Sequence, residues 1–365
     1  MNRVLRKLMH DTVLPLQGAN LSIDGFLNQP APWKNSVLGA LCFSGEAITH
    51  PGHIDPDIPC LGVPMQLLDT GDTQCEVWRG DGELTQGQWG AIHYRHDAEV
   101  LFGVIVLDEA QFIADVDKTP LQQATELAYH QVFTLLETLR FPYLLRFWNY
   151  IADINSASFG LERYRQFNLG RQDAFLAHGR EIVGNVPAAC ALGFGQKDMT
   201  QAPLSIAFLA GRAAPISIEN PRQISAYQYP EQYGARSPTF SRAGLVRLGQ
   251  DEVLFISGAA SIVGHATLHP GDVAAQTRET MTNIEAVLAE ANRLTRQTRF
   301  DLASLHYKVY VRHATDLVPI RAELERIVGG ALNAIYLQAD VCRQDLLLEI
   351  EATAAHPVLM PDHSH

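Results

Sequence analysis

The sequence predicts an α+β protein with two similar halves, each a mixed β-sheet with helices packed on one face. In each half, short aliphatic and aromatic runs bounded by Gly and Asp are followed by one long segment of helical periodicity. The second half repeats the order of the first, and this pattern is typical of a sheet covered on one side. Gly, Lys, Gln and Pro collect between Gly195 and Pro203, so we expect domains of residues 1–197 and 198–365.

The first half contains short strand candidates and two helix candidates. Apolar residues recur near helical spacing over Leu121–Leu139, and residues 160–178 also have a helical pattern, interrupted by Gly170. The expected strands are Val37–Phe43, Gln74–Trp78, Trp89–Tyr94, Val100–Leu107 and the aromatic-rich Tyr143–Tyr150.

The second half follows the same order. Asp272–Arg296 has apolar residues at i, i+3 and i+4 steps, and Leu317–Val328 is a shorter helix closed by Gly329. The expected strands are Leu204–Leu209, Gly244–Leu248, Val253–Ser257, the alternating Ser304–Arg312 and Leu346–Ala352.

Composition excludes several classes of protein. The 365 residues are 47% hydrophobic and 19% charged, and the net charge is 28 − 40 = −12, without the basic patches of a nucleic-acid binder. We expect no signal peptide, because no apolar stretch precedes Asp11. We expect no membrane span, because the least charged stretch, Val253–Gly271, is broken by polar residues and Pro. The five cysteines are odd in number and far apart, which favours reduced thiols in a cytoplasm over disulfides.

Generic motifs for metals and cofactors fail. Gly193-Phe-Gly195 lacks the third glycine of a dinucleotide loop, since Asp198 stands there. His265 and His269 are four residues apart, but Pro270 directly after His269 disfavours a helix there. Without a helix the two imidazoles do not share a face for a metal ion, so we expect ordinary polar histidines. No G-x-S-x-G sequence is present. We therefore expect no metal and no cofactor.

Two segments rich in Tyr and Arg have the composition of a carboxylate-binding site. Tyr164 and Arg171 lie seven residues apart, two helical turns, and so share a face. The alternative is a surface helix with solvated arginines. Residues 220–242 form a long segment with three prolines and no apolar periodicity, typical of a functional loop. Arg and Tyr together can hold a planar carboxylate.

Three stretches resemble signatures of the chorismatase family: Phe147–Arg171, Asn220–Pro238 and Ile256–His265. The similarity extends roughly from Phe141 to Ala352, and the last hundred residues also resemble the RidA/YjgF (chorismate-mutase-like) fold. The resemblance implies two such halves, with chorismate as the small-molecule substrate and release of pyruvate. RidA-fold proteins form trimers with clefts between subunits. A chain with two such halves can build a comparable cleft internally, so we expect a monomer.

The resemblance also implies roles for individual residues. Glu349 matches the catalytic glutamate that protonates the enolpyruvyl methylene, which requires a raised pKa. Glu351 lies on the same face and either supplies a like charge or is solvated. The residues that match substrate-binding positions are Tyr164, Arg171, Tyr229, Tyr233, Arg242 and Gly258.

Cys342 matches a position that divides the family. Branches that form a dihydroxycyclohexadiene carboxylate by adding water have Ala there, whereas branches that form 3-hydroxybenzoate have Cys. Cys342 therefore implies 3-hydroxybenzoate, with or without 4-hydroxybenzoate, unless it is only a small buried residue. The hydrolase branch remains an alternative. So does a non-catalytic RidA-like binder of small carboxylates, although Ala334 stands where its clamping Arg is expected.

Overall fold

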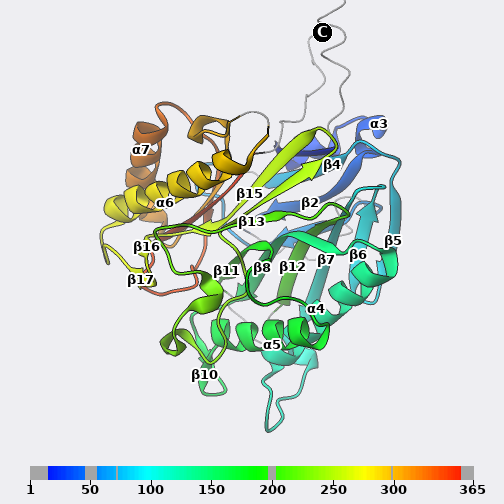
Figure 1. Cartoon of the computed structure of the whole chain (residues 1–365), viewed down its shortest axis with the longest axis horizontal. Coiled ribbons are helices and arrows are strands. Elements are labelled where there is room, and N and C mark those ends of the chain that lie inside the picture. The colour runs from blue at the N-terminus through cyan, green and yellow to red at the C-terminus, as the bar shows by residue number, and fades with distance from the viewer. Residues whose placement is uncertain (1–14, 46–55, 71–72, 196–202, 297–298, 355–365) are drawn as a thin grey trace, which may run out of the picture.

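The computed structural model describes residues 15–45, 56–70, 73–195, 203–296 and 299–354. Within these ranges the strands form three main sheets and two short hairpins. Figure 1 shows helices at the periphery of the molecule and strands between them. No helix in the described ranges is long and apolar enough to span a membrane.

The first sheet has four strands in the order β1-β4-β2-β3. Two short helices, α2 (Ile23–Leu27) and α3 (Ala31–Lys34), follow β1 and bury Phe26 and Trp33. The sequence predicted β2 and β4 but not β1 or β3. The strands are β1 (Leu16–Ser22), β2 (Val37–Phe43), β3 (Cys60–Val63) and β4 (Gln74–Gly80).

The second sheet has six strands in the order β5-β6-β7-β12-β8-β11. Strands β8 and β11 are parallel, and β12 runs antiparallel to both of its neighbours. Helices α4 (Pro120–Leu139) and α5 (Arg163–Ala177) belong to this unit. Its strands are β5 (Thr85–Trp89), β6 (Ile92–His96), β7 (Val100–Asp108), β8 (Tyr143–Ala152), β11 (Ala188–Phe194) and β12 (Pro203–Gly211).

The third sheet repeats this topology in the order β13-β14-β15-β20-β18-β19, again with its parallel pair, β18 and β19, at one end. Helices α6 (Val273–Leu294) and α7 (Leu317–Val328) take the places of α4 and α5. The expected class, with two similar halves, is confirmed. The strands of the third sheet are β13 (Ile216–Ile218), β14 (Ala243–Leu248), β15 (Asp251–Ala259), β18 (His306–Val311), β19 (Asn333–Gln338) and β20 (Leu348–Ala354).

The two short hairpins lie outside the three main sheets. One pairs β9 (Ala157–Ser158) with β10 (Leu161–Glu162), and the other pairs β16 (Ile262–Val263) with β17 (Ala266–Thr267).

The predicted division at 197/198 is misplaced. It would separate β12 from the sheet that this strand completes, between β7 and β8. Since β12 corresponds to β20, the last strand of the third sheet, the N-terminal half ends at Gly211 and the C-terminal half begins with β13. Most of the Gly- and Pro-rich segment that suggested the division, residues 196–202, lies outside the described residues.

The first sheet repeats the last four strands of the larger sheets, because β1-β4-β2-β3 matches β15-β20-β18-β19 in order and direction. One face of each sheet contributes to a shared core, with members that include Trp78, Trp148 and Phe255. The opposite faces pack against their own helices in separate cores. The protein is therefore three related sheets around one core, with helices outside (Figure 1).

Two further predictions are corrected. The expected strand Trp89–Tyr94 is a hairpin, because Gly90 adopts φ +55° and turns the chain between β5 and β6. The expectation of reduced thiols is wrong for Cys42 and Cys75, which form a disulfide. They are direct partners across β2 and β4, a register that their spacing in sequence does not reveal. Cysteine usage therefore does not indicate a cytoplasmic location.

Candidate active site

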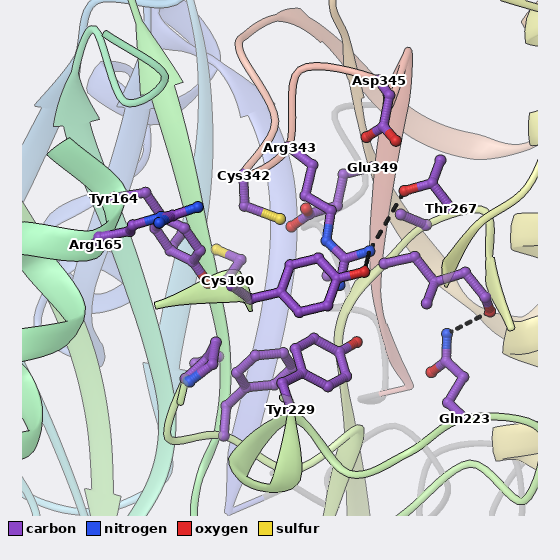
Figure 2. Close-up of a pocket in the computed structure, with 18 of the residues that line it drawn as sticks. Tyr164, Arg165, Cys190, Gln223, Tyr229, Thr267, Cys342, Arg343, Asp345 and Glu349 are labelled. Atoms are coloured by element: carbon purple, nitrogen blue, oxygen red, sulfur yellow. Dashed lines mark hydrogen bonds between the residues drawn. The ribbon is translucent and has the colours of Figure 1, made fainter. Parts of the chain in front are cut away.

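A cavity of about 520 Å³ lies between the N-terminal and C-terminal halves. All eight residues predicted for the site line it. Figure 2 labels four of them: Tyr164, Tyr229, Cys342 and Glu349. They come from helix α5, the loop between β13 and β14, strand β15, the connection from β19 to β20, and β20 itself. In the order of those elements they are Tyr164 and Arg171, then Tyr229, Tyr233 and Arg242, then Gly258, Cys342 and Glu349.

Glu349 reaches the cavity because β20 alternates its side chains between two faces. Leu348 and Ile350 pack into the core against α6 and α7, and Glu349 points the other way. Its carboxyl group lies against Gly258, where an added Cβ would stand 1.8 Å from Oε1. In the described part of the chain, no hydrogen bond or ion pair to this carboxyl group is found. The Glu349 carboxyl group is therefore buried, packs against Gly258 and faces the cavity.

Burial raises the pKa of Glu349 to about 8, and the negative charge of Glu351 adds to this shift. Arg146 and Arg242 act in the opposite direction, with smaller effect. A carboxyl group with such a pKa is largely protonated at neutral pH. The arrangement supplies a proton donor in a water-accessible cavity.

Glu351 is not solvated, so that alternative is wrong. Its side chain is buried and forms ion pairs with Arg146 and Lys308. The Trp148 indole N–H and the Tyr310 hydroxyl also donate to it, at 3.2 and 3.1 Å. Burial alone would raise the pKa of Glu351, but the two cations outweigh burial and hold it well below its usual range. Glu351 is thus the like charge that the sequence suggested.

Two predicted arginines present positive charge to the cavity. Arg171 is 2% exposed, donates to Asn168 Oδ1 at 2.8 Å and lies over the Phe167 ring. Arg242 donates to the Tyr229 hydroxyl at 2.8 Å. Neither forms an ion pair within the described ranges. Buried guanidinium groups without a carboxylate partner are suited to binding an anionic ligand.

The alternative of a solvated surface helix is therefore wrong for Arg171. It holds for Arg165, which lies one turn and a half earlier on α5. The Arg165 side chain is 39% exposed and pairs with Glu162 at the edge of the cavity.

Arg343 is a third cavity arginine, which the sequence analysis missed. It donates to the His265 carbonyl at 2.8 Å and lies 4.0 Å from the Tyr233 ring centroid. Figure 2 shows its guanidinium group among the cavity side chains, bonded to Thr267. Its neighbour Cys342 was the only signal in the sequence that could have drawn attention to it.

Two thiols line the same cavity. Burial raises the pKa of Cys342 to about 12, with a further contribution from Glu349, so this residue is a neutral thiol. Figure 2 shows its sulfur directed toward the Glu349 carboxyl group. Cys190, on β11, was not predicted; burial raises the pKa of its thiol as well. A neutral thiol can donate a weak hydrogen bond but is a poor nucleophile.

Together these groups fit acid chemistry on a small dianion. Arg171, Arg242 and Arg343, with three tyrosines, can hold anionic groups, while Glu349 can deliver a proton to an atom between them. No group of three or more His, Cys, Asp or Glu side chains in the described ranges is placed to hold a metal ion.

Comparisons with known proteins agree with this chemistry. The family model described as "Chorismatase FkbO/Hyg5-like, N-terminal" matches residues 76–210, and so ends with β12. A 3-hydroxybenzoate synthase from Streptomyces hygroscopicus is 34% identical over 329 residues, which cover 88% of this chain and 92% of the relative. A chorismatase from Streptomyces rapamycinicus is 36% identical over 305 residues, covering 80% and 87%. A crystal structure of a chorismatase superposes with a TM-score of 0.80 at 31% identity, covering 93% of this chain and 98% of that one.

Proposed function

This chain belongs to the chorismatase family, and from that premise we propose that it converts chorismate into 3-hydroxybenzoate and pyruvate, with Glu349 as the proton donor. The observation that carries the proposal is the position of Glu349, a buried carboxyl group with a pKa of about 8. The same cavity is lined by Arg171, Arg242 and Arg343, and none of these three forms an ion pair within the described ranges. We also propose 4-hydroxybenzoate as a second product.

Binding of the substrate uses the positive side chains. Chorismate carries two carboxylates, one on the ring and one on the enolpyruvyl group. Arg171 with Tyr164 forms one anion-binding group, on the N-terminal half, and Arg242 with Tyr229 and Tyr233 forms another, on the C-terminal half. Because the two groups come from different halves, they can hold the two carboxylates apart and direct the ether toward Glu349.

Proton transfer then breaks the ether. Glu349 gives its proton to the methylene carbon, which becomes a methyl group, and the electrons of the ring C–O bond form the pyruvate carbonyl. The ring carbon left behind is electron-deficient, and the oxygen of the neighbouring hydroxyl bonds to it as the hydroxyl loses its proton. The product of this step is an epoxide-like intermediate.

Cys342 acts after pyruvate has left. As a neutral thiol it can donate a hydrogen bond to the epoxide oxygen while the ring opens, and loss of a ring proton restores aromaticity. Chorismate contains the same atoms as pyruvate and hydroxybenzoic acid together, so this route consumes no water. The alternative hydrolase route consumes one water and gives a dihydroxydiene.

The experiment that tests the function is incubation with chorismate in water enriched in ¹⁸O, followed by mass spectrometry of the ring product. We expect pyruvate and unlabelled 3-hydroxybenzoate. A labelled dihydroxydiene as the main product would assign the enzyme to the hydrolase branch. Binding of chorismate without pyruvate release would leave only the RidA-like binder.

We also propose that the enzyme is a monomer. The three sheets already share one core, and the candidate site draws on both halves of a single chain, so no second copy is needed to form a cleft. Light scattering at several protein concentrations should give the mass of one chain. A stable trimer would contradict the proposal.

A further inference from the structure

Behind the cavity, four buried charged residues from three sheets form what we call the ion cluster: Glu76 on β4, Arg146 on β8, Lys308 on β18 and Glu351 on β20. None of the four lines the candidate active site. Glu76, Lys308 and Glu351 instead line a separate small cavity of about 20 Å³, further along β20 toward its C-terminal end. The ion cluster therefore does not touch a substrate held against Glu349.

With both carboxyl groups ionised, the ion cluster is balanced in charge; burial raises the pKa of Glu76, and the ion pair with Lys308 opposes this shift. Two carboxylates and two cations sum to zero, and each cation has a carboxylate partner: Lys308 pairs with both Glu76 and Glu351, and Arg146 pairs with Glu351. Glu349 precedes Glu351 by two residues on the same face of β20, a separation of roughly 6.6 Å along a strand. If Glu349 were ionised, Glu349 and the ion cluster together would carry one net negative charge, which is costly for buried groups. Arg242, outside the ion cluster, offsets this cost only in part.

The ion cluster also holds in place the backbone against which Glu349 packs. Arg146 Nη1 donates to the Ile256 carbonyl at 3.1 Å. The pairing of β15 with β20 is irregular between Ile256 and Ala259, and Gly258 lies in this interval. The Arg146 guanidinium group thus forms an ion pair with Glu351 and a hydrogen bond with the backbone next to Gly258, the glycine that contacts Glu349.

Other charged or titratable groups face Glu349 from the surrounding elements. Arg146 and Arg242 favour its ionised form, and Glu351 opposes them. Among the described residues, the thiols of Cys190 and Cys342 and the hydroxyl of Tyr164 also interact electrostatically with Glu349, and these groups are neutral in their usual state. Tyr310 is the direct partner of Glu349 across β18 and β20. Glu351 therefore offsets the effect of Arg146 on the pKa of Glu349.

We infer that Glu351, held as a carboxylate by Arg146 and Lys308, is a positioning residue that keeps Glu349 in its acid form between turnovers. Glu76 extends this function to the first sheet, because it shares Lys308 with Glu351. The inference rests on the proposed role of Glu349 as proton donor. It adds a set of residues outside the cavity that determine the pH range in which Glu349 is protonated.

The test is the pH profile of kcat/KM for pyruvate release. Wild-type activity should fall as the pH rises through about 8. In Glu351→Gln, Arg146 and Lys308 lose their common carboxylate, so the falling limb should move to lower pH by about one unit or more. Lys308→Met removes a cation instead, so the limb should move to higher pH. Opposite shifts from two neighbouring substitutions cannot arise from a general loss of stability.

Two controls separate charge from structure. Glu351→Asp keeps the charge and should leave the limb near that of the wild type. Glu252→Gln removes another buried carboxylate, paired with Arg247 on the neighbouring strand, and should leave the limb unchanged even if the protein melts earlier. Shifts of equal direction in Glu351→Gln and Lys308→Met, or an equal shift in Glu351→Asp and Glu351→Gln, would overturn the inference.

A second readout does not depend on turnover. The carbonyl stretch of a protonated carboxyl group in the infrared spectrum can be assigned to Glu349 by its loss in Glu349→Gln. In the ligand-free protein this band should disappear at a lower pH in Glu351→Gln than in the wild type. If the wild type released no pyruvate but the band shifted as expected, the proposed function would fail while the control of Glu349 by Glu351 would stand. A band that disappears at the same pH in both proteins would overturn the inference.

Discussion

The carboxyl group of Glu349 rests on the backbone of Gly258, with no room between them for a single carbon atom: an added Cβ would lie 1.8 Å from Oε1 and 2.5 Å from Cδ. Gly258→Ala should therefore displace the proton donor. We expect kcat to fall roughly a hundredfold, as is usual when a catalytic group is misplaced by about 1 Å, while chorismate still binds. Steady-state kinetics measure this, and Gly330→Ala is the matched control, because nothing lies within 4 Å of its new Cβ.

Glu349→Gln keeps the shape of the side chain but removes its acidic proton. Pyruvate release should fall roughly 10²–10⁴-fold, the usual contribution of general acid catalysis. Chorismate binding, measured by calorimetry, should change little. Glu290→Gln alters an exposed ion pair on α6 and should have no effect on either quantity. Full activity in Glu349→Gln would refute the mechanism.

Glu349 should also leave a signature in stability. Its pKa is about 8 in the folded protein and near 4.5 when unfolded, so the folded state binds the extra proton between these values. The contribution of Glu349 to stability is complete below pH 4.5 and is lost as the pH rises to 8, by up to about 1.4 kcal/mol per pH unit. Melting curves from pH 5 to 9 should show the wild type losing stability relative to Glu349→Gln. Parallel curves would contradict the raised pKa.

Cys342→Ala removes a group that the mechanism needs only after pyruvate has left. Pyruvate release should continue, and the ring product should shift from 3-hydroxybenzoate toward the dihydroxydiene. Chromatography of the products measures the ratio. Cys60→Ala removes a buried thiol outside the cavity and should keep the wild-type ratio. An unchanged ratio in Cys342→Ala would mean that its thiol only fills space.

Arg171→Lys tests the binding of a carboxylate. Lysine keeps the charge but not the planar fork, so one of two parallel hydrogen bonds is lost. We expect KM for chorismate to rise about tenfold, equivalent to about 1.4 kcal/mol, with a smaller change in kcat. Arg293→Lys, on the exposed face of α6, is the control. A fall in kcat with an unchanged KM would indicate that Arg171 acts in proton transfer rather than in binding.

Periodicity predicted the long elements of the fold well. The apolar spacing of α4 and α6 and the alternation in β18 are local properties, and the structure has these elements close to their predicted ends. The first sheet was largely missed because β3 is only four residues long and β1 has no clear alternation. The position of β12 between β7 and β8 is a matter of topology, which spacing along the chain does not determine.

Residues of the candidate site were predicted where they fall in or near family motifs. Residues and ion pairs outside any motif were not predicted. Residues within the family signatures, such as Tyr229 and Gly258, proved to line one cavity. Arg343 belongs to no motif. The ion pair between Glu76 and Lys308 joins residues 232 positions apart, and no pattern in either segment points to the other. Long-range pairing of buried charges can be identified only once the register of the strands is known.

The three sheets around one core have a consequence for how such a protein can change. In an assembly of three identical chains, every substitution appears in all three clefts at once, and a residue that suits one cleft must be tolerated in the others. Here each sheet is encoded separately, so a proton donor such as Glu349 can occupy one cleft alone. The other sheets are then free to diverge, and on β4 the buried carboxylate Glu76 serves as an ion-pair partner of Lys308.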